Sequence, residues 1–323
     1  MDEFSFINSI QQSYYRQSSL LKGIGDDAAV IRSNNQDIVI AKDMFVENVH
    51  FNKETMTPYH IGYKALAANL SDMAAMRAKP AFYLVGISIS DNWSTDDLNE
   101  IYEGMQSLAN QYNVDLIGGD TVSGSELVIS ITVLGFTNKD NASLRSLAQE
   151  GDIIFATGTL GDSQAGLHML FHPDNYKDEK YFKRRHQMPS PRVDFALGLQ
   201  SISRVALNDI SDGIASEAHE IAEASNVSIV LQDEKLPIHP YLSQFDTDLQ
   251  YKWKLFGGED YELLGTVSKR EWETVKQVAS QQNVRVTEIG YVTAVQPVSR
   301  VLFQQKNGKM VRLEKKGYNH LSR

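Results

Sequence analysis

The sequence contains no cysteine, which excludes disulfide bonds, thiolate metal sites and a cysteine nucleophile. It is also poor in basic residues, since 31 lysines and arginines stand against 41 aspartates and glutamates and leave a net charge of -10. This balance argues against a broad surface for nucleic acids or anionic membranes, because such partners need a positively charged footprint. No run of about 18 apolar residues could span a membrane, and the acidic start MDEFSFINSI does not have the pattern of a secretory signal. We therefore expect a cytoplasmic protein that binds any anionic ligand through local cations.

The length of 323 residues favours two domains, and either half is long enough to bury a core. Apolar runs typical of strands alternate with helical spacing in both halves, which predicts a mixed α/β fold class. The polar, turn-rich stretch TNKDNASLRSLAQEGD separates the two halves. We predict an N-terminal domain over 1–140 and a C-terminal domain over 141–323.

Several aspartates are predicted to lie where a strand or helix ends. A short buried strand over 38–41 would place Asp43 at its end, and a helix that opens at Thr57-Pro58 would carry Asp72 near its end. The segment VDLIGGDTV is predicted to run from a strand into a Gly-Gly turn, which Asp120 follows. These positions suit side chains that act on a ligand.

Carboxylates beside glycines and turns recur along the chain. The set comprises Asp27, Asp43, Asp72, Asp120, Asp209 and Asp212. Hard cations such as magnesium prefer oxygen ligands, so this set predicts a magnesium site. In the segment NDISDG, two aspartates also precede a predicted helix start, where backbone N–H groups can receive a phosphate. The alternative is that each aspartate only forms a turn, because aspartate beside glycine is common turn chemistry.

Several familiar nucleotide and nucleophile motifs are absent. The segment GTLGDSQAG follows a predicted strand but lacks the Lys-Ser/Thr ending of a Walker A loop. No Rossmann fingerprint and no GxSxG nucleophile elbow occur. The basic run Lys183–His186 is predicted to be a solvated face, with a phosphate contact as the alternative.

Ten motifs, in order along nearly the whole chain, resemble those of the thiamine-monophosphate kinases. They are GIGDDAAV, DMFVENVHF, KALAANLSDMAAM, LIGGDT, LRSLAQEGD, TGTLGDS, PSPR, DISDG, GGEDYEL and KKGYNH. This family is similar to aminoimidazole ribonucleotide synthetase, in a superfamily that binds ATP without a Walker A loop. The resemblance implies a two-domain fold of that type, in which the N-terminal domain forms the core of a homodimer and the C-terminal α/β domain completes a cleft. It also implies ATP-dependent phosphorylation of thiamine monophosphate to thiamine diphosphate with several Mg²⁺ ions.

The resemblance also assigns roles by motif position. Magnesium would be held by Asp27, Lys42, Asp43, Asp72, Asp120, Asp209 and Asp212. ATP would contact Gly119, Asp120, Arg145 and Ser211, and thiamine monophosphate would contact His50, Glu259 and Tyr318. Catalytic roles would fall to Asp120, Arg145 and Asp212, because phosphoryl transfer depends on neutralising and positioning two polyanions. The acceptor phosphate has a second pKa of about 6 and needs little help from a general base.

The chain departs from the family at Ala41 and Lys42, where two small hydroxyl residues usually precede Asp43. We hypothesise that the Lys42 ammonium replaces part of a metal's charge, or points away while the backbone carbonyl binds metal. The number of metal ions therefore stays open. Two alternatives to the kinase also remain, namely another ATP-using enzyme of the superfamily and a non-catalytic nucleotide-binding regulator.

Overall fold

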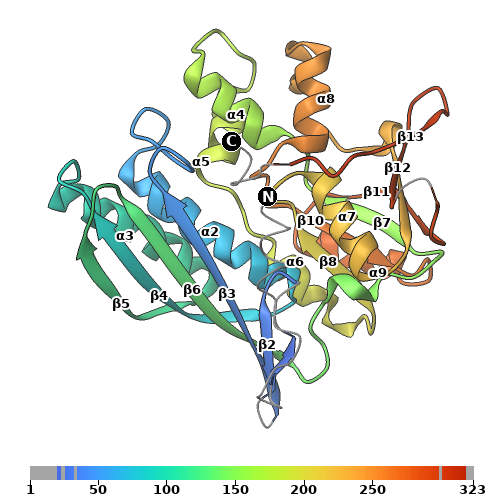
Figure 1. Cartoon of the computed structure of the whole chain (residues 1–323), viewed down its shortest axis with the longest axis horizontal. Helices are drawn as coiled ribbons and strands as arrows, with labels where there is room; N and C mark the ends of the chain where they lie inside the picture. Colours follow the sequence, from blue (N-terminus) through green and yellow to red (C-terminus); the bar gives the residue numbers. More distant parts are fainter. Residues whose placement is uncertain (1–19, 23–25, 33–34, 298–299, 318–323) are drawn as a thin grey trace.

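The structure, a computed structural model, describes residues 20–22, 26–32, 35–297 and 300–317, which fold around two β-sheets (Figure 1). The elements of the first part are β1 (Leu20–Lys22), β2 (Ala29–Arg32), β3 (Gln36–Val46), α2 (Pro58–Ala75), β4 (Lys79–Ile89), α3 (Thr95–Tyr112), β5 (Asp115–Ser123) and β6 (Val128–Asn138). The second part contains η1 (Arg145–Leu147), β7 (Ile153–Thr157), α4 (Asp162–Phe171), α5 (Glu179–Gln187), α6 (Val193–Gly198), η2 (Leu199–Ser201), β8 (Val205–Asp209), α7 (Ile214–Ala224), β9 (Ser228–Gln232), η3 (Asp233–Lys235), η4 (Pro240–Gln244), α8 (Thr247–Phe256), β10 (Leu263–Val267), α9 (Trp272–Gln281), β11 (Val286–Thr293), β12 (Val301–Gln304) and β13 (Met310–Arg312). Helices and sheets in both parts confirm the predicted mixed α/β fold class. Among the described residues, no helix has the length and apolar character needed to cross a membrane.

The first sheet has the strand order β1-β2-β3-β6-β4-β5, so β5 forms one edge (Figure 1). Neighbouring strands are antiparallel except for β4 and β5, which run parallel. Helix α2 packs against β3, β4 and β6 and buries that face of the sheet. Alternate side chains point to the opposite face, where Phe82, Leu84, Leu134 and Phe136 are only half-buried. The second face is therefore apolar and only partly covered by the described residues.

Helix α2 lies between the two sheets and is buried on nearly every side (Figure 1). Its N-cap Thr57 accepts a hydrogen bond from the His60 N–H at 3.3 Å, and Pro58 occupies the first turn, where its missing N–H costs nothing. The helix contacts β8 and α6 as well as the first sheet. The structure thus confirms the predicted helix and carries Asp72, near its C-terminal end, toward the second sheet.

The second sheet has the strand order β13-β12-β9-β11-β7-β10-β8, with β12 and β9 parallel and the other pairs antiparallel. Every residue of β7, β8 and β10 is buried, because helices cover both faces. On one face, Ile154 packs in a core with the apolar residues of α7, and on the other Phe155 packs in a core with residues of α6 and α9. This double cover fixes the end of β8, where Asp209 lies.

Two predicted strand ends are wrong. Strand β3 continues through Asp43 to Val46 and pairs with β6 along its whole length, so Asp43 lies inside a strand. Strand β5 likewise runs through the predicted Gly-Gly turn. A Cβ atom on Gly119 would lie 2.0 Å from the Val85 carbonyl oxygen, so this glycine serves close packing of β5 on β4. In both cases cross-strand pairing overrides a local turn preference.

The prediction that the basic run Lys183–His186 is exposed to solvent is also wrong for two of its four residues. Arg185 and His186 are buried, with exposed fractions of 8% and 1%. The Arg185 Nη2 atom lies 2.7 Å from Glu262 Oε1, a buried carboxylate that also binds Arg192. Buried partners far along the chain therefore hold charges that the local sequence places on the surface.

Candidate active site

A cavity of about 1210 Å³ is lined by both halves of the chain. Its walls come from β3 and α2 in the first part, and from α4, α8, the β8–α7 loop and residues 257–261 in the second. The sequence-predicted site residues that line it are Lys42, Asp43, His50, Asp72, Asp209, Ser211, Asp212 and Glu259. The other predicted residues are Asp27, Gly119, Asp120 and Arg145, which are not part of the lining, and Tyr318, which lies outside the described residues.

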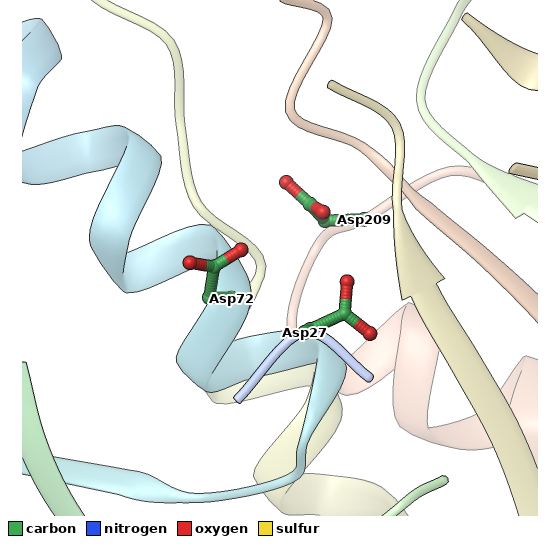
Figure 2. A group of neighbouring side chains, drawn as sticks. All are labelled: Asp27, Asp72 and Asp209. Atoms are coloured by element: carbon green, nitrogen blue, oxygen red, sulfur yellow. The ribbon is translucent and has the colours of Figure 1, made fainter. Parts of the chain in front are cut away.

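Three of the predicted metal ligands form a cluster beside this cavity (Figure 2). Asp27 lies in a bend before β2, Asp72 near the end of α2 and Asp209 at the end of β8. One carboxylate oxygen from each lies within 4.8 Å of the others. The Ser71 hydroxyl donates to Asp209 Oδ2 at 2.8 Å and fixes that side chain. Asp27 Oδ2 is buried and has no hydrogen-bond partner among the described residues.

Burial and mutual repulsion make this cluster electrostatically unfavourable by itself. Burial raises the pKa of Asp27 to about 6, although Arg145 opposes the shift. Burial, and then the charges of Asp43 and Asp209, raise the pKa of Asp72 well above its usual range. The pKa of Asp209 is raised by burial and by Asp27. Within the described ranges no lysine or arginine forms an ion pair with Asp72 or Asp209, so the cluster has the charge and the oxygen donors that suit a divalent cation.

Arg145 holds one member of the cluster in place. Its Nη2 atom donates to Asp27 Oδ1 at 2.8 Å, and its Nε atom donates to Asn208 Oδ1 at 3.1 Å. The remaining arm, Nη1, lies 2.7 Å from Glu220 Oε2. All three nitrogen atoms of the guanidinium therefore have a partner within the protein, and the contact with Asp27 orients that carboxylate. Arg145 does not line the cavity in this conformation.

The loop between β8 and α7 brings together the residues of the NDISDG segment. The Asp212 N–H donates to Glu217 Oε1 at 3.1 Å, and Asn208 Nδ2 donates to Glu217 Oε2 at 2.7 Å. Glu217 therefore ties the start of α7 to the end of β8. The Ser211 carbonyl accepts a hydrogen bond from the Glu259 N–H at 2.7 Å, which joins this loop to the opposite cavity wall.

Lys42 and Asp43 point to opposite faces of the first sheet, as alternation in a strand requires. The Asp43 N–H donates to Asn69 Oδ1 of α2 at 3.1 Å, and burial raises the pKa of Asp43 to about 6. The Lys42 ammonium instead donates to Ser130 Oγ at 2.6 Å on the exposed face. The Lys42 ammonium is therefore directed away from the carboxylate cluster, as in the second of the two hypotheses for this residue.

Gly119 and Asp120 lie on the exposed edge strand β5. The strand register places Asp43 opposite Ile131, Ile131 opposite Val85, and Val85 opposite Gly119. Three strand spacings of about 4.8 Å therefore put Asp120 roughly 14 Å from Asp43 within one chain. The structure does not bring Asp120 to the other predicted metal ligands.

The predicted thiamine phosphate contacts His50 and Glu259 both line the cavity. His50 Nδ1 accepts a hydrogen bond from the Val46 N–H at 3.1 Å, and the ring stacks on Phe45 at a centroid distance of 5.1 Å. Glu259 Oε2 accepts a hydrogen bond from the Lys64 ammonium at 2.9 Å. That lysine charge contributes to a lowered pKa for Glu259, against the effect of burial.

Sequence reasoning missed the residues that hold the predicted site residues in place. Ser71, Lys64 and His186 all contact predicted site residues. Lys64 and Ser71 lie in the motif KALAANLSDMAAM and His186 in the basic run Lys183–His186, but no role was assigned to them. Lys64 offered one usable signal, because it interrupts the otherwise apolar helical face of Ile61, Ala65 and Leu66. A lysine at such a position needs a buried partner.

Comparisons with known proteins agree over the whole chain. Residues 25–137 match the family described as "AIR synthase related protein, N-terminal domain", and residues 149–302 match "AIR synthase related protein, C-terminal domain". The chain is 46% identical over 327 residues to a thiamine-monophosphate kinase of Bacillus subtilis (strain 168), with 99% of each chain covered.

Solved structures give the same result. A structure described as "AaThiL complexed with AMPPCP and TMP" superposes with a TM-score of 0.85 at 30% identity and covers 99% of this chain and 97% of that chain. A thiamine-monophosphate kinase from Stenotrophomonas maltophilia K279a gives a TM-score of 0.78 at 33% identity, covering 91% and 93%. Both the sequence and the fold therefore match along nearly the full length.

Proposed function

We propose that this chain, which belongs to the thiamine-monophosphate kinase family of AIR synthase related proteins, transfers the terminal phosphoryl group of ATP directly to thiamine monophosphate. The products are ADP and thiamine diphosphate. Relatives carry the name of this activity, and one related structure holds AMPPCP, an ATP analogue, together with TMP. A single in-line transfer needs both substrates in one cavity, and the volume of about 1210 Å³ is sufficient for two ligands.

The carboxylate cluster of Asp27, Asp72 and Asp209 is the observation that carries this proposal. Its residues fit magnesium, because Asp27 Oδ2 is a buried acceptor without a partner in the described ranges and the three carboxyl groups have raised pKa values. We propose that these residues, with Asp43 and Asp212, hold Mg²⁺ ions. Magnesium bound there would neutralise charge on the ATP phosphates, which is the main obstacle to transfer between two polyanions.

The chain's own residues orient the cluster and bind the substrates. Arg145 fixes Asp27, and Ser71 fixes Asp209, so neither carboxylate needs to reorganise when ATP binds. Ser211 and Asp212 line the cavity beside the start of α7, where backbone N–H groups favour phosphate. We propose that Ser211 contacts ATP and that Asp212 lies close to the transferred group.

Glu259 and His50 are proposed to contact thiamine monophosphate from the other side of the cavity. This substrate carries a cationic thiazolium ring in addition to its phosphate, and the lowered pKa of Glu259 keeps a carboxylate available for the cation. Charge complementarity of this kind orients a ligand more than it tightens binding. Stacking of Tyr318 on the thiamine rings stays a prediction, because that residue lies outside the described ones.

We propose that the protein acts as a homodimer, in which residues 1–140 form the contact and residues 141–323 complete each cavity. The support is the half-buried apolar face of the first sheet, with Phe82, Leu84 and Phe136, and the exposed edge strand β5. Leu116, Ile117 and Val122 of that strand are about half exposed, which is unusual for large apolar side chains in one place. A second copy of the chain would cover both features.

A homodimer would also explain the position of Asp120. Because Asp120 lies roughly 14 Å from Asp43 within one chain, we propose that it acts in the site of the partner. Mixing the inactive variants Asp120→Asn and Asp72→Asn and allowing subunit exchange should then restore about a quarter of the activity, since half of the dimers have one complete site. No recovery would mean that Asp120 acts within its own chain.

A chromatographic assay tests the reaction itself. Purified protein with ATP, magnesium and thiamine monophosphate should yield thiamine diphosphate and ADP in equal amounts. Asp72→Asn should lower the rate by at least about a hundredfold, because it removes a metal ligand, whereas the exposed turn variant Asp91→Asn should leave the rate unchanged. ATP binding without thiamine diphosphate would contradict the proposal and indicate another substrate of the superfamily or a regulator without turnover.

A further inference from the structure

Lys64 is a fully buried lysine in the middle of α2, with no exposed side-chain area. Its neighbours along the helix are apolar and belong to the main core. A buried ammonium group is costly unless it is paired. The partner of Lys64 is Glu259, 195 residues away, whose Oε2 atom lies 2.9 Å from Lys64 Nζ. The pair therefore joins the helix of the first part to the cavity wall of the second.

A neutral histidine completes the surroundings of this ammonium. His186 Nδ1 lies 3.4 Å from Lys64 Nζ and 3.1 Å from Ser163 Oγ. Burial, and then the Lys64 charge, lower the pKa of His186 to about 3, so the ring is neutral and Nδ1 can accept from these two donors. The Lys64 ammonium is thus held between a carboxylate from the cavity wall and an imidazole from α5.

Glu259 needs such support because its backbone is strained. Its φ angle of 66° is left-handed, which non-glycine residues rarely adopt, and Tyr261 two positions later has a φ angle of 49°. The Glu259 N–H donates to the Ser211 carbonyl at 2.7 Å, which holds the backbone against the β8–α7 loop. Strained residues of this kind persist only where the surrounding structure fixes them, and they concentrate at functional sites.

The Glu259 side chain is exposed to 22% and lines the cavity. With Oε2 bound to Lys64, the other oxygen, Oε1, makes no hydrogen bond within the described part of the chain. We infer that Lys64 is a positioning residue, which holds Glu259 so that Oε1 receives the cationic end of thiamine monophosphate. The inference rests on the proposed function, because it assumes that Glu259 binds this substrate.

The test compares steady-state kinetics of Lys64→Met, Glu259→Gln and the double variant with those of the wild type. Lys64→Met should raise the KM for thiamine monophosphate about tenfold, as expected for the loss of one charge-assisted contact, and leave kcat and the KM for ATP within about twofold. Lys64→Arg should recover most of the binding, because it keeps the charge and a donor. Lys254→Met, which breaks the half-buried ion pair with Asp233 outside the cavity lining, is the matched control and should leave both KM values unchanged.

The double variant decides whether Lys64 acts through Glu259. If it does, the double variant should bind thiamine monophosphate no worse than Glu259→Gln alone. A KM for thiamine monophosphate that is unchanged in Lys64→Met would overturn the inference. A lower kcat together with higher KM values for both substrates, in proportions that multiply with the effects of Glu259→Gln, would also overturn the inference. That result would indicate a purely structural lysine.

Two further points keep this test conclusive. If Lys64→Met does not fold, the double variant can be used in its place, because it leaves no unpaired charge in the core. A KM for thiamine monophosphate in the double variant that exceeds that of Glu259→Gln would then contradict the inference. If the wild type does not phosphorylate thiamine monophosphate at all, the proposed function fails. Failure of the positioning role is distinct from this, since it requires an active wild type whose KM does not respond to Lys64.

Discussion

Replacing Asp72 by asparagine should stabilise the protein in the absence of divalent metal while it abolishes most of the activity. The reason is the crowding of Asp27, Asp72 and Asp209, whose nearest oxygens lie within 4.8 Å of one another. Asp72 has no ion pair in the described ranges, and burial and like charges raise its pKa. Asparagine keeps the shape, removes one charge and can donate hydrogen bonds to the remaining carboxylates.

The size of the effect follows from the geometry. Two full charges 4.8 Å apart repel each other by about 3.5 kcal/mol at an effective dielectric constant of about 20. Partial protonation already relieves some of this repulsion near neutral pH, so we expect a net gain of about 1–2 kcal/mol in the free energy of unfolding. For a chain of 323 residues, that gain corresponds to a rise in Tm of about 1.5–3 °C.

The sign of the pH dependence gives a second, independent check. A carboxyl group whose pKa is raised in the folded state adds stability at low pH that is lost as the pH rises through the folded pKa. For Asp72, whose folded pKa lies well above its usual range, this loss begins above the ordinary aspartate pKa of 3.8 and continues as the pH rises through the raised folded value. The advantage of Asp72→Asn over the wild type should therefore be small near pH 4 and grow steadily as the pH rises.

Thermal unfolding in EDTA and in saturating Mg²⁺ measures these effects. We expect Asp72→Asn to be more stable than the wild type in EDTA and to gain much less from Mg²⁺, since metal binding to the folded state stabilises it by mass action. The exposed Asp91→Asn should match the wild type in both buffers. The reasoning is refuted if Asp72→Asn melts below the wild type in EDTA, or if Mg²⁺ stabilises both proteins equally.

Three further predictions concern residues around the site. Arg145→Lys should raise the Mg²⁺ concentration needed for half-maximal rate by about tenfold or more, because lysine cannot hold Asp27, Asn208 and Glu220 together; an unchanged magnesium titration would contradict this. Glu262→Gln should cost about 3–5 kcal/mol in urea unfolding at pH 7, since it removes the ion-pair partner of Arg192 and leaves Arg185 only with Asp162, whose Oδ2 atom lies 3.9 Å from Arg185 Nε. The lowered pKa of Glu262 adds stability above about pH 4.5 that is lost as the pH falls, so the variant and the wild type should converge in acid. Gly119→Ala should cost about 1–3 kcal/mol in thermal unfolding, because its Cβ would lie 2.0 Å from the Val85 carbonyl oxygen, and equal melting curves would show that β5 can move away at no cost.

Local signals in the sequence were sufficient where a short segment determines its own structure. Thr57 and Pro58 start α2 through an N-cap and a proline in the first turn, and the helix then carries Asp72 near its end as predicted. Gly213 likewise precedes α7, with a φ angle of 108° that favours glycine, so the NDISDG segment could be read directly. These signals gave the helix that carries Asp72 and the helix start that follows the loop after Asp209.

Features that depend on distant partners could not be predicted in this way. Strand β3 continues past Ala41 because β6, about 90 residues later, pairs with it to Val46. Arg185 and His186 appear as a basic surface run until Glu262 and Glu259 are brought beside them. Within one chain Asp120 lies far from the cluster, so a turn pattern in the sequence could not predict which of the expected metal ligands come together.

The charge of Arg145 is itself balanced by Glu220, which bears on the magnesium site that we propose at the carboxylate cluster. Arg145 is the only ion-pair partner of the clustered carboxylates among the described residues, and it reaches only Asp27. Its other arm binds Glu220, and its charge offsets only part of the effect of burial and like charges on the pKa values of Asp72 and Asp209. Without Glu220, Arg145 would neutralise more of the negative charge of the cluster and so weaken the attraction of the cluster for magnesium. Glu220 therefore preserves negative charge at the cluster, as the Mg²⁺ site that we propose would require.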